Sequence, residues 1–134
     1  MRKVGIDTNI LLRLLVDDDP IQRKAVINFG AGIGVDYTGF VTLISILEID
    51  WALRTQYGYA KHESADAIGR LMRIRGVEIQ EHRNVATALE WVTSTGGDLA
   101  DALIAHLCLD AGCENVATLD KKAAAKIAAM ELIS

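Results

Sequence analysis

Five acidic residues that lie far apart in the sequence could together hold a divalent cation: Asp7, Glu48, Asp98, Asp101 and Asp120. Two unit charges about 4 Å apart interact by about 4 kcal/mol at an effective dielectric constant of about 20, so carboxylates that converge repel one another strongly. A divalent cation reverses the sign of this energy, and a set of oxygen ligands favours Mg²⁺ or Mn²⁺. Such an ion polarises a phosphoryl oxygen and lowers the pKa of bound water, so the chemistry that these residues predict is in-line phosphoryl hydrolysis.

Each of these acids also has an ordinary structural explanation when it is taken alone. Asp98 and Asp120 can each cap a helix, and Asp7 can be a turn residue. Glu48 lies in a helix that is apolar on almost every side, where a carboxylate is costly unless it is paired, reaches the helix edge or binds a cation. Small residues flank Asp101 and permit close approach of other elements. The metal hypothesis therefore depends on the acids being close together.

Short apolar runs that alternate with helical periodicity predict the elements that must position these acids. Strands are expected at residues 4–6, 35–41, 77–80, 116–119 and 132–133. Helices are expected from about residue 10 to 15, 20 to 29, 42 to 57, 59 to 72, 85 to 95, 98 to 111 and 121 to 130, the third of them capped by Thr42. Apolar strands without polar alternation imply a parallel sheet covered on both faces. The predicted fold is α/β, a three-layer α/β/α sandwich with a central parallel sheet of four to five strands, and residues 1–134 form a single domain.

The predicted sheet places two of the acids at the same edge. Asp7 follows the strand at 4–6, and Asp120 follows the strand at 116–119. Ligands of such sheets bind outside the carboxyl ends of the strands. We therefore expect the carboxylates to converge at this edge.

The composition excludes several classes of protein. The chain of 134 residues has 14 basic and 18 acidic side chains, a net charge of -4, which disfavours a protein that holds polyanions by bulk charge alone. The longest segments without a charged residue reach only 11 residues, far below the roughly 18 that a membrane helix needs. Cys108 and Cys113 are too few for a disulfide scaffold. We expect a cytoplasmic protein with reduced thiols and no membrane partner.

The acids stand in four motifs that together resemble those of the PIN-domain ribonucleases, and within them the VapC toxins of toxin-antitoxin pairs. The motifs are Gly5-Ile6-Asp7-Thr8-Asn9, Ser45-Ile46-Leu47-Glu48, Asp98-Leu99-Ala100-Asp101 and Thr118-Leu119-Asp120-Lys121-Lys122. They correspond to the family's opening strand with its first acid, its helix-borne Glu, its third motif and its fourth. Four motifs in the right order are far more specific than any one of them.

This resemblance implies a Mg²⁺- or Mn²⁺-dependent endoribonuclease that cuts single-stranded or loop regions of structured RNA through a metal-activated water. Asp7, Glu48, Asp101 and Asp120 would hold the metal directly or through water, with Asp98 as their companion. Thr8, Asn9 and Thr118 would orient these ligands by hydrogen bonding, although each also suits a helix cap or a strand end. The resemblance further implies a cognate antitoxin as partner and a homodimer.

An RNA substrate also needs cations beyond the metal. The candidate RNA-binding residues are Arg13, Arg54, Lys61, Arg70, Arg73, Lys121 and Lys122. Surface charge of this kind is often only solvated, so we predict the role for the group and not for any one member. Asp50 and Arg54 have the i, i+4 spacing of an ordinary surface ion pair, and Asp50 is therefore left outside the predicted site.

Two other functions fit parts of the pattern. A Mg²⁺-dependent phosphohydrolase of the haloacid dehalogenase type also has an Asp at the end of its first strand, but it needs a second Asp two residues later, and this chain has Asn9 there. A non-catalytic PIN module that binds RNA or protein is the second alternative, and the presence of all four main acids argues against it. A role in RNA processing without toxicity also remains open.

Overall fold

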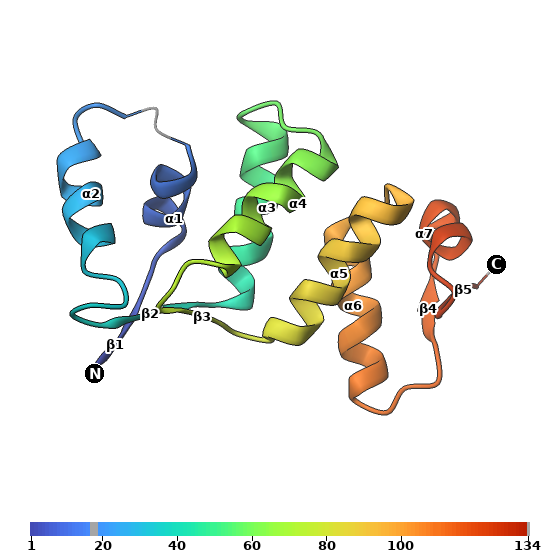
Figure 1. Cartoon of the computed structure of the whole chain (residues 1–134). Coiled ribbons are helices and arrows are strands. Elements are labelled where there is room, and N and C mark those ends of the chain that lie inside the picture. The colour runs from blue at the N-terminus through green and yellow to red at the C-terminus, as the bar shows by residue number, and fades with distance from the viewer. Residues whose placement is uncertain (17–18, 134) are drawn as a thin grey trace.

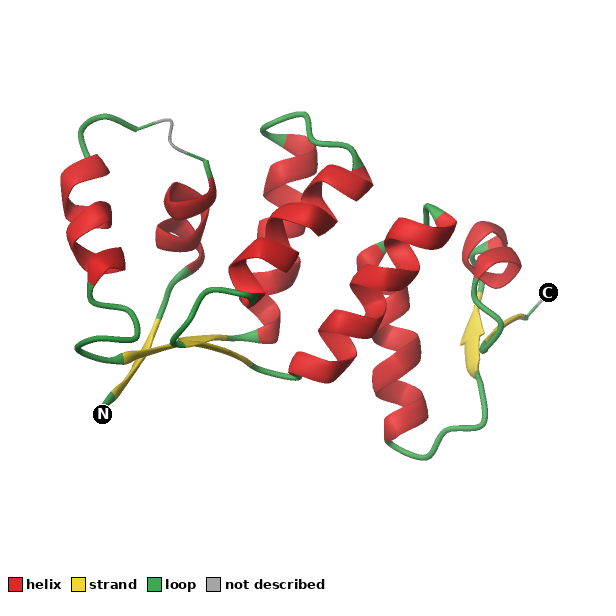
Figure 2. Cartoon of the chain, in the orientation of Figure 1, coloured by secondary structure: helices red, strands yellow, loops and turns green. Residues whose placement is uncertain are grey.

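The computed structural model describes residues 1–16 and 19–133, in which short strands alternate with longer helices (Figure 1). The strands are β1 (Lys3–Gly5), β2 (Thr38–Val41), β3 (Val77–Ile79), β4 (Val116–Thr118) and β5 (Met130–Leu132). The helices are α1 (Thr8–Leu15), α2 (Arg23–Ala31), α3 (Leu43–Thr55), α4 (Lys61–Met72), α5 (His82–Thr95), α6 (Leu99–Asp110) and α7 (Lys121–Lys126) (Figure 2). These strands pair in parallel, which confirms the predicted α/β class.

Helix α3 shows how the sequence starts and buries these helices. Thr42 has extended backbone angles, and its Oγ1 accepts a hydrogen bond from the N–H of Ser45 at 3.1 Å, so the predicted cap is confirmed. Ile46, Ile49 and Leu53 follow at helical spacing and are fully buried. Their side chains belong to a main core that joins α1, α3, α4, α5 and α6 to β2 and β3.

The first three strands form one sheet in the order β1, β2, β3. Val4 lies opposite Gly39 on β2, and Gly39 lies opposite Val77 on β3. A glycine suits this central position because a Cβ atom there would lie 2.6 Å from Cδ1 of the buried Ile6. β4 and β5 form a second sheet of two strands. β2 is therefore paired on both sides, whereas β1 is at the edge of its sheet.

The strands thus do not form the single central sheet of four to five strands that the sequence predicts. The physical reason is a second apolar cluster, in which Ala105 of α6 packs with Ala123, Ile127 and Met130. This cluster holds β4, β5 and α7 against α6. Figure 1 shows the resulting row, which runs from α2 and α1 through α3 and α4, then α5 and α6, to α7 with β4 and β5.

The elements that are shorter than predicted include one helix and one strand whose shortening has a visible cause. The helix expected at 121–130 ends at Lys126, because Ile127 has extended backbone angles and is buried in the second apolar cluster. The strand expected at 35–41 begins only at Thr38, because hydrogen-bonded turns precede it.

None of the helices in the described residues is long and apolar enough to span a bilayer. The longest, α5, has 14 residues, whereas a bilayer needs about 20.

Candidate active site

The first two acids of the predicted site are linked where β1 leads into α1. Asp7 caps α1, and its Oδ1 accepts a hydrogen bond from the N–H of Thr8 at 2.8 Å. The Thr8 hydroxyl donates to Oε1 of Glu48 at 2.7 Å and lies 3.0 Å from Oγ of Ser45. Thr8 and Ser45 are buried, while both carboxylates are exposed. We call Asp7, Thr8, Ser45 and Glu48 the Asp7 group.

Three further acids lie where α6 and α7 begin. Asp98 caps α6, and its Oδ2 accepts a hydrogen bond from the N–H of Asp101 at 3.2 Å. Asp120 caps α7, and its Oδ1 accepts from the N–H of Lys122 at 2.9 Å. The N–H of Asp120 donates in turn to Oγ1 of Thr118 at 3.0 Å, so Thr118 contacts the acid that it was predicted to orient. We call Asp98, Asp101 and Asp120 the Asp101 group.

The neighbouring charges of the Asp101 group affect the pKa of Asp101. Burial raises the pKa of Asp101 above the ordinary value, and the negative charges of Asp98 and Asp120 raise it further. The positive charge of Lys61 opposes this shift.

The two groups do not form one pocket within a single chain. Across residues 1–16 and 19–133, no three His, Cys, Asp or Glu side chains are placed so that they could hold one metal ion. The expected convergence of the carboxylates is therefore wrong for the chain in this arrangement. The physical reason is the split sheet: β4 pairs with β5 and packs on α6, so Asp120 is not brought to the end of β1.

A buried network positions one side of the Asp101 group. Asp50 is only 6% exposed and accepts a hydrogen bond from Oγ of the fully buried Ser64 at 2.7 Å. Nη2 of Arg54 lies 3.1 Å from Oδ2 of Asp50 and 3.3 Å from Oδ1 of Asp98. The prediction of an ordinary surface pair between Asp50 and Arg54 is therefore wrong, because i, i+4 spacing carries no information on what covers a helix face. Arg54 connects α3 to the start of α6.

The predicted RNA-binding cations divide among several places. Lys61, Lys121 and Lys122 accompany the Asp101 group: Lys61 is close enough to affect the pKa of Asp101, and the two other lysines are exposed in the first turn of α7. Arg54 forms ion pairs with Asp50 and Asp98. Arg13 is half-buried, and its Nη1 donates to the Tyr57 hydroxyl at 3.2 Å.

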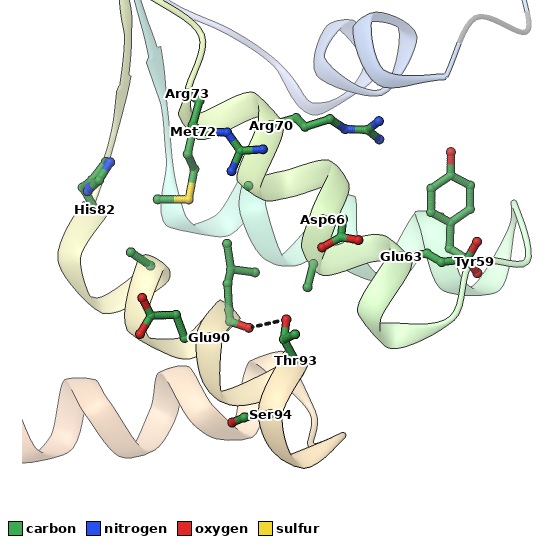
Figure 3. Close-up of a pocket in the computed structure, with 14 residues that line it drawn as sticks. Tyr59, Glu63, Asp66, Arg70, Met72, Arg73, His82, Glu90, Thr93 and Ser94 are labelled. Atoms are coloured by element: carbon green, nitrogen blue, oxygen red, sulfur yellow. Dashed lines mark hydrogen bonds between the residues drawn. The ribbon is translucent and has the colours of Figure 1, made fainter.

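Arg70 and Arg73 line a groove of about 1040 Å³ between α4 and α5. Figure 3 shows both guanidinium groups extending from α4, with Glu90 and Thr93 on α5. The predicted acids do not line this groove, so these two arginines are separate from both groups of acids.

A second groove, of about 510 Å³, lies beside Glu48 and is lined by Asn9, Ile44 and Trp51 among others. The structure thus places Asn9 next to the Asp7 group. Ser45 stands in the same motif as Glu48, and its position three residues earlier puts the two on one helical face, but its contact with Thr8 was not predicted. Sequence reasoning missed Ser64, which no motif marks.

Comparison with known proteins identifies the fold family. The chain matches the PIN domain family over residues 4–129. The chain belongs to the PIN domain family. It is also similar to a solved structure, the crystal structure of VapBC2 from Rickettsia felis bound to a DNA fragment from their promoter, with 14% sequence identity, 98% of each chain covered and a TM-score of 0.42. No curated protein sequence matches it.

PIN domains are generally nucleases, and PIN nucleases generally use divalent metals. The chemistry of the carboxylate donors in this chain suits such an ion, since hard divalent cations take oxygen ligands. The placement of these carboxylates does not suit a single ion, because within one chain they are divided between the Asp7 group and the Asp101 group. The residues of a single PIN chain in this arrangement therefore do not fit a shared metal ion.

Proposed function

We propose that this PIN domain is a metal-dependent endoribonuclease and the toxin of a toxin-antitoxin pair, with residues 1–134 as a single nuclease domain. The observation that carries the proposal is the family match over residues 4–129, which spans all four acidic motifs. The resemblance of these motifs to those of the VapC toxins supports the RNA substrate and the antitoxin partner.

The proposed roles of the acidic residues follow from the resemblance of their motifs to those of the family. Asp7, Glu48, Asp101 and Asp120 stay the predicted ligands of Mg²⁺ or Mn²⁺, with Asp98 beside them, although this arrangement of the chain does not bring them together around one ion. One carboxylate oxygen each of Asp7, Glu48 and Asp120 accepts a hydrogen bond, and Asp98 accepts from the start of α6 and faces Arg54. The ion would supply Lewis acidity and an activated water.

The neighbouring polar residues hold these acids in place. The Thr8 hydroxyl fixes one oxygen of Glu48, and Thr118 fixes the backbone of Asp120. Lys121 and Lys122 lie next to Asp120 and are exposed, so they can contact RNA phosphates. The 5′-phosphate and 3′-hydroxyl ends of the cleaved RNA are the expected products.

The test is cleavage of a labelled hairpin RNA by purified protein with Mn²⁺ or Mg²⁺, with and without EDTA. Asp7→Asn is the informative variant, because Asn also caps helices well and should leave α1 intact. Glu114→Gln is the matched control, since Glu114 is an exposed acid in the connection from α6 to β4. We expect cleavage by the wild type and by Glu114→Gln, and none by Asp7→Asn or in EDTA. Cleavage that survives both EDTA and Asp7→Asn refutes the proposal.

The toxin role has its own test in cells. Induced expression should arrest growth for the wild type and not for Asp7→Asn, and co-expression of a small protein encoded next to the gene should relieve the arrest. Sequencing RNA 5′ ends shortly after induction identifies the target. Arrest that Asp7→Asn also causes would show that toxicity does not depend on cleavage.

A non-catalytic PIN module is the second candidate. The observation in its favour is the separation of the Asp7 group from the Asp101 group, since a binding module needs no assembled metal site. The two functions give different results in one assay. A binding module retains hairpin RNA in a filter-binding experiment and leaves it uncut with every metal tested.

A further inference from the structure

The two cysteines of the chain lie at the end of helix α6, on either side of the turn that leads towards β4 (Figure 1). Cys108 is in the last turn of the helix and is half-buried, whereas Cys113 follows the helix and is exposed. They are the only cysteines in the sequence of 134 residues. Both are free thiols in this structure. How close they come to one another depends on the path of the chain between them.

This turn is a Schellman motif. The N–H of Gly112 donates to the carbonyl oxygen of Leu109 at 3.0 Å. The N–H of Cys113 donates to the carbonyl oxygen of Cys108, also at 3.0 Å. Gly112 has a φ of 94°, the left-handed conformation that reverses the chain in such a motif. The two residues joined by the outer hydrogen bond commonly have their side chains in contact, and here both of them are cysteines.

The outer hydrogen bond limits the distance between the two cysteines. Within one residue, the Cα atom lies about 2.4 Å from the carbonyl oxygen and about 1.5 Å from the nitrogen. The Cα atoms of Cys108 and Cys113 are therefore at most about 7 Å apart, and the bond angle at the nitrogen lowers this limit to about 6.3 Å. Disulfides join Cα atoms that are about 4.4 to 6.8 Å apart. The backbone of the turn thus allows a disulfide between these two residues.

We propose that Cys108 and Cys113 form a thiol modification site, which reacts with small-molecule disulfides and closes into an internal disulfide. The exposed Cys113 thiolate attacks one sulfur of the small disulfide, a mixed disulfide forms, and the first small thiolate leaves. The Cys108 thiolate then attacks Sγ of Cys113, the internal bond forms, and the second small thiolate leaves. The protein gives two electrons to the small disulfide, which is reduced to two thiols, and the two protons of the cysteines go to solvent. Both steps are reversible, so an excess of small thiol returns the protein to its two free thiols.

The internal disulfide would close a covalent ring around the end of α6. Asp110 lies inside this ring, and its carboxylate accepts a hydrogen bond at 2.8 Å from the buried Asn84 of α5. The ring would therefore oppose fraying of the last turn of α6 and loss of this contact with α5. Asp101 is seven residues from Cys108, about 10 Å along the helix axis. The inference does not depend on the proposed nuclease function, and RNA cleavage is not its readout.

Mass spectrometry of the whole protein tests the site directly. The reduced protein is incubated with oxidised glutathione, and the remaining thiols are then blocked with N-ethylmaleimide. We expect a main product that has lost two hydrogen atoms, carries neither glutathione nor maleimide, and returns to the reduced mass in dithiothreitol. Protein that keeps both thiols, carries glutathione on them or links two chains overturns the proposal.

Moving one thiol by a single residue separates the effect of the turn from nearness in the sequence. Cys113→Ala/Glu114→Cys keeps two thiols, but the second one then follows the position that is bonded to Cys108. Wild type and this variant are titrated with glutathione redox buffers, both folded and in urea. The folded wild type should form the internal disulfide at a ratio of oxidised to reduced glutathione at least about 10-fold lower than the variant, whereas in urea the two should agree within about 2-fold. Equal ratios for the two folded proteins overturn the proposal.

The melting temperature shows whether the disulfide fits the native turn. The ring has six residues and removes loop-closure entropy from the unfolded chain, so the oxidised wild type should melt about 5–8 °C above the reduced protein. Cys113→Ser is the control, because after the same treatment it can form only a mixed disulfide and should show no such rise. A melting temperature that stays constant or falls when the wild type is oxidised overturns the proposal, since the bond would then strain the fold.

Discussion

Replacement of Asp50 by alanine should destabilise the fold through the partner that it leaves behind. Ser64 is fully buried, and its hydroxyl donates to Asp50 at 2.7 Å. In Asp50→Ala this hydroxyl loses its acceptor, and a buried polar group without a partner costs about 1–3 kcal/mol. Arg54 is 26% exposed and keeps its contact with Asp98, so loss of its ion pair with Asp50 adds at most about 1 kcal/mol. Together these give a loss of about 1–4 kcal/mol in the free energy of unfolding.

Urea denaturation followed by tryptophan fluorescence and circular dichroism measures this loss. Asp66→Ala is the control, because Asp66 is an exposed carboxylate on α4 and should change the unfolding free energy by less than about 0.5 kcal/mol. The double variant Asp50→Ala/Ser64→Ala then tests the cause. Ser64→Ala should cost about 1–2 kcal/mol in the wild type, but in Asp50→Ala it should restore stability, because it removes the unpaired hydroxyl. Equal costs in the two backgrounds would refute the reasoning.

Three further predictions concern single residues. Thr8→Val removes the hydrogen bond to Glu48 and should slow RNA cleavage about 10- to 100-fold, whereas Thr8→Ser should retain the wild-type rate; equal rates for all three proteins contradict the positioning role. The raised pKa of Asp101 means that its ionised form destabilises the fold, a cost that is complete above the folded pKa and disappears as the pH falls below the ordinary value of 3.8. Asp101→Asn should therefore stabilise the protein against urea at neutral pH and gain less in acid, and a gain that grows with acidification contradicts this sign. Gly97→Ala places a Cβ atom 1.8 Å from the Trp91 ring and should lower the unfolding free energy by about 1–3 kcal/mol; wild-type stability in urea would show that the ring moves freely.

Local features of the fold were predictable from the sequence because they depend on neighbouring residues. Thr42 and Asp98 were expected to cap helices, and both do. The strand expected at 116–119 is β4, and the strand expected at 77–80 is β3, each shorter by one residue. Capping and apolar periodicity act within a few residues, so a single sequence contains the information.

Long-range placement was not predictable in the same way. The sequence gives no sign that β4 is held on α6 and not beside β1, because the buried contacts of Ile127 and Met130 depend on the packing of distant segments. The burial of Asp50 was missed for a related reason. Its spacing from Arg54 is the same for an exposed pair, and only the position of Ser64 on another helix makes the carboxylate a buried acceptor.

Asp7, Asp98 and Asp120 each cap a helix, so the negative charge of each can be removed without loss of the cap. Each of these side chains begins a helix with one carboxylate oxygen, and an amide oxygen performs that task equally well. Exchange of a single oxygen atom for an NH₂ group therefore removes a negative charge while the helix still has its first hydrogen bond. For the proposed nuclease, an inactive form with the same fold is therefore one substitution away from the wild type.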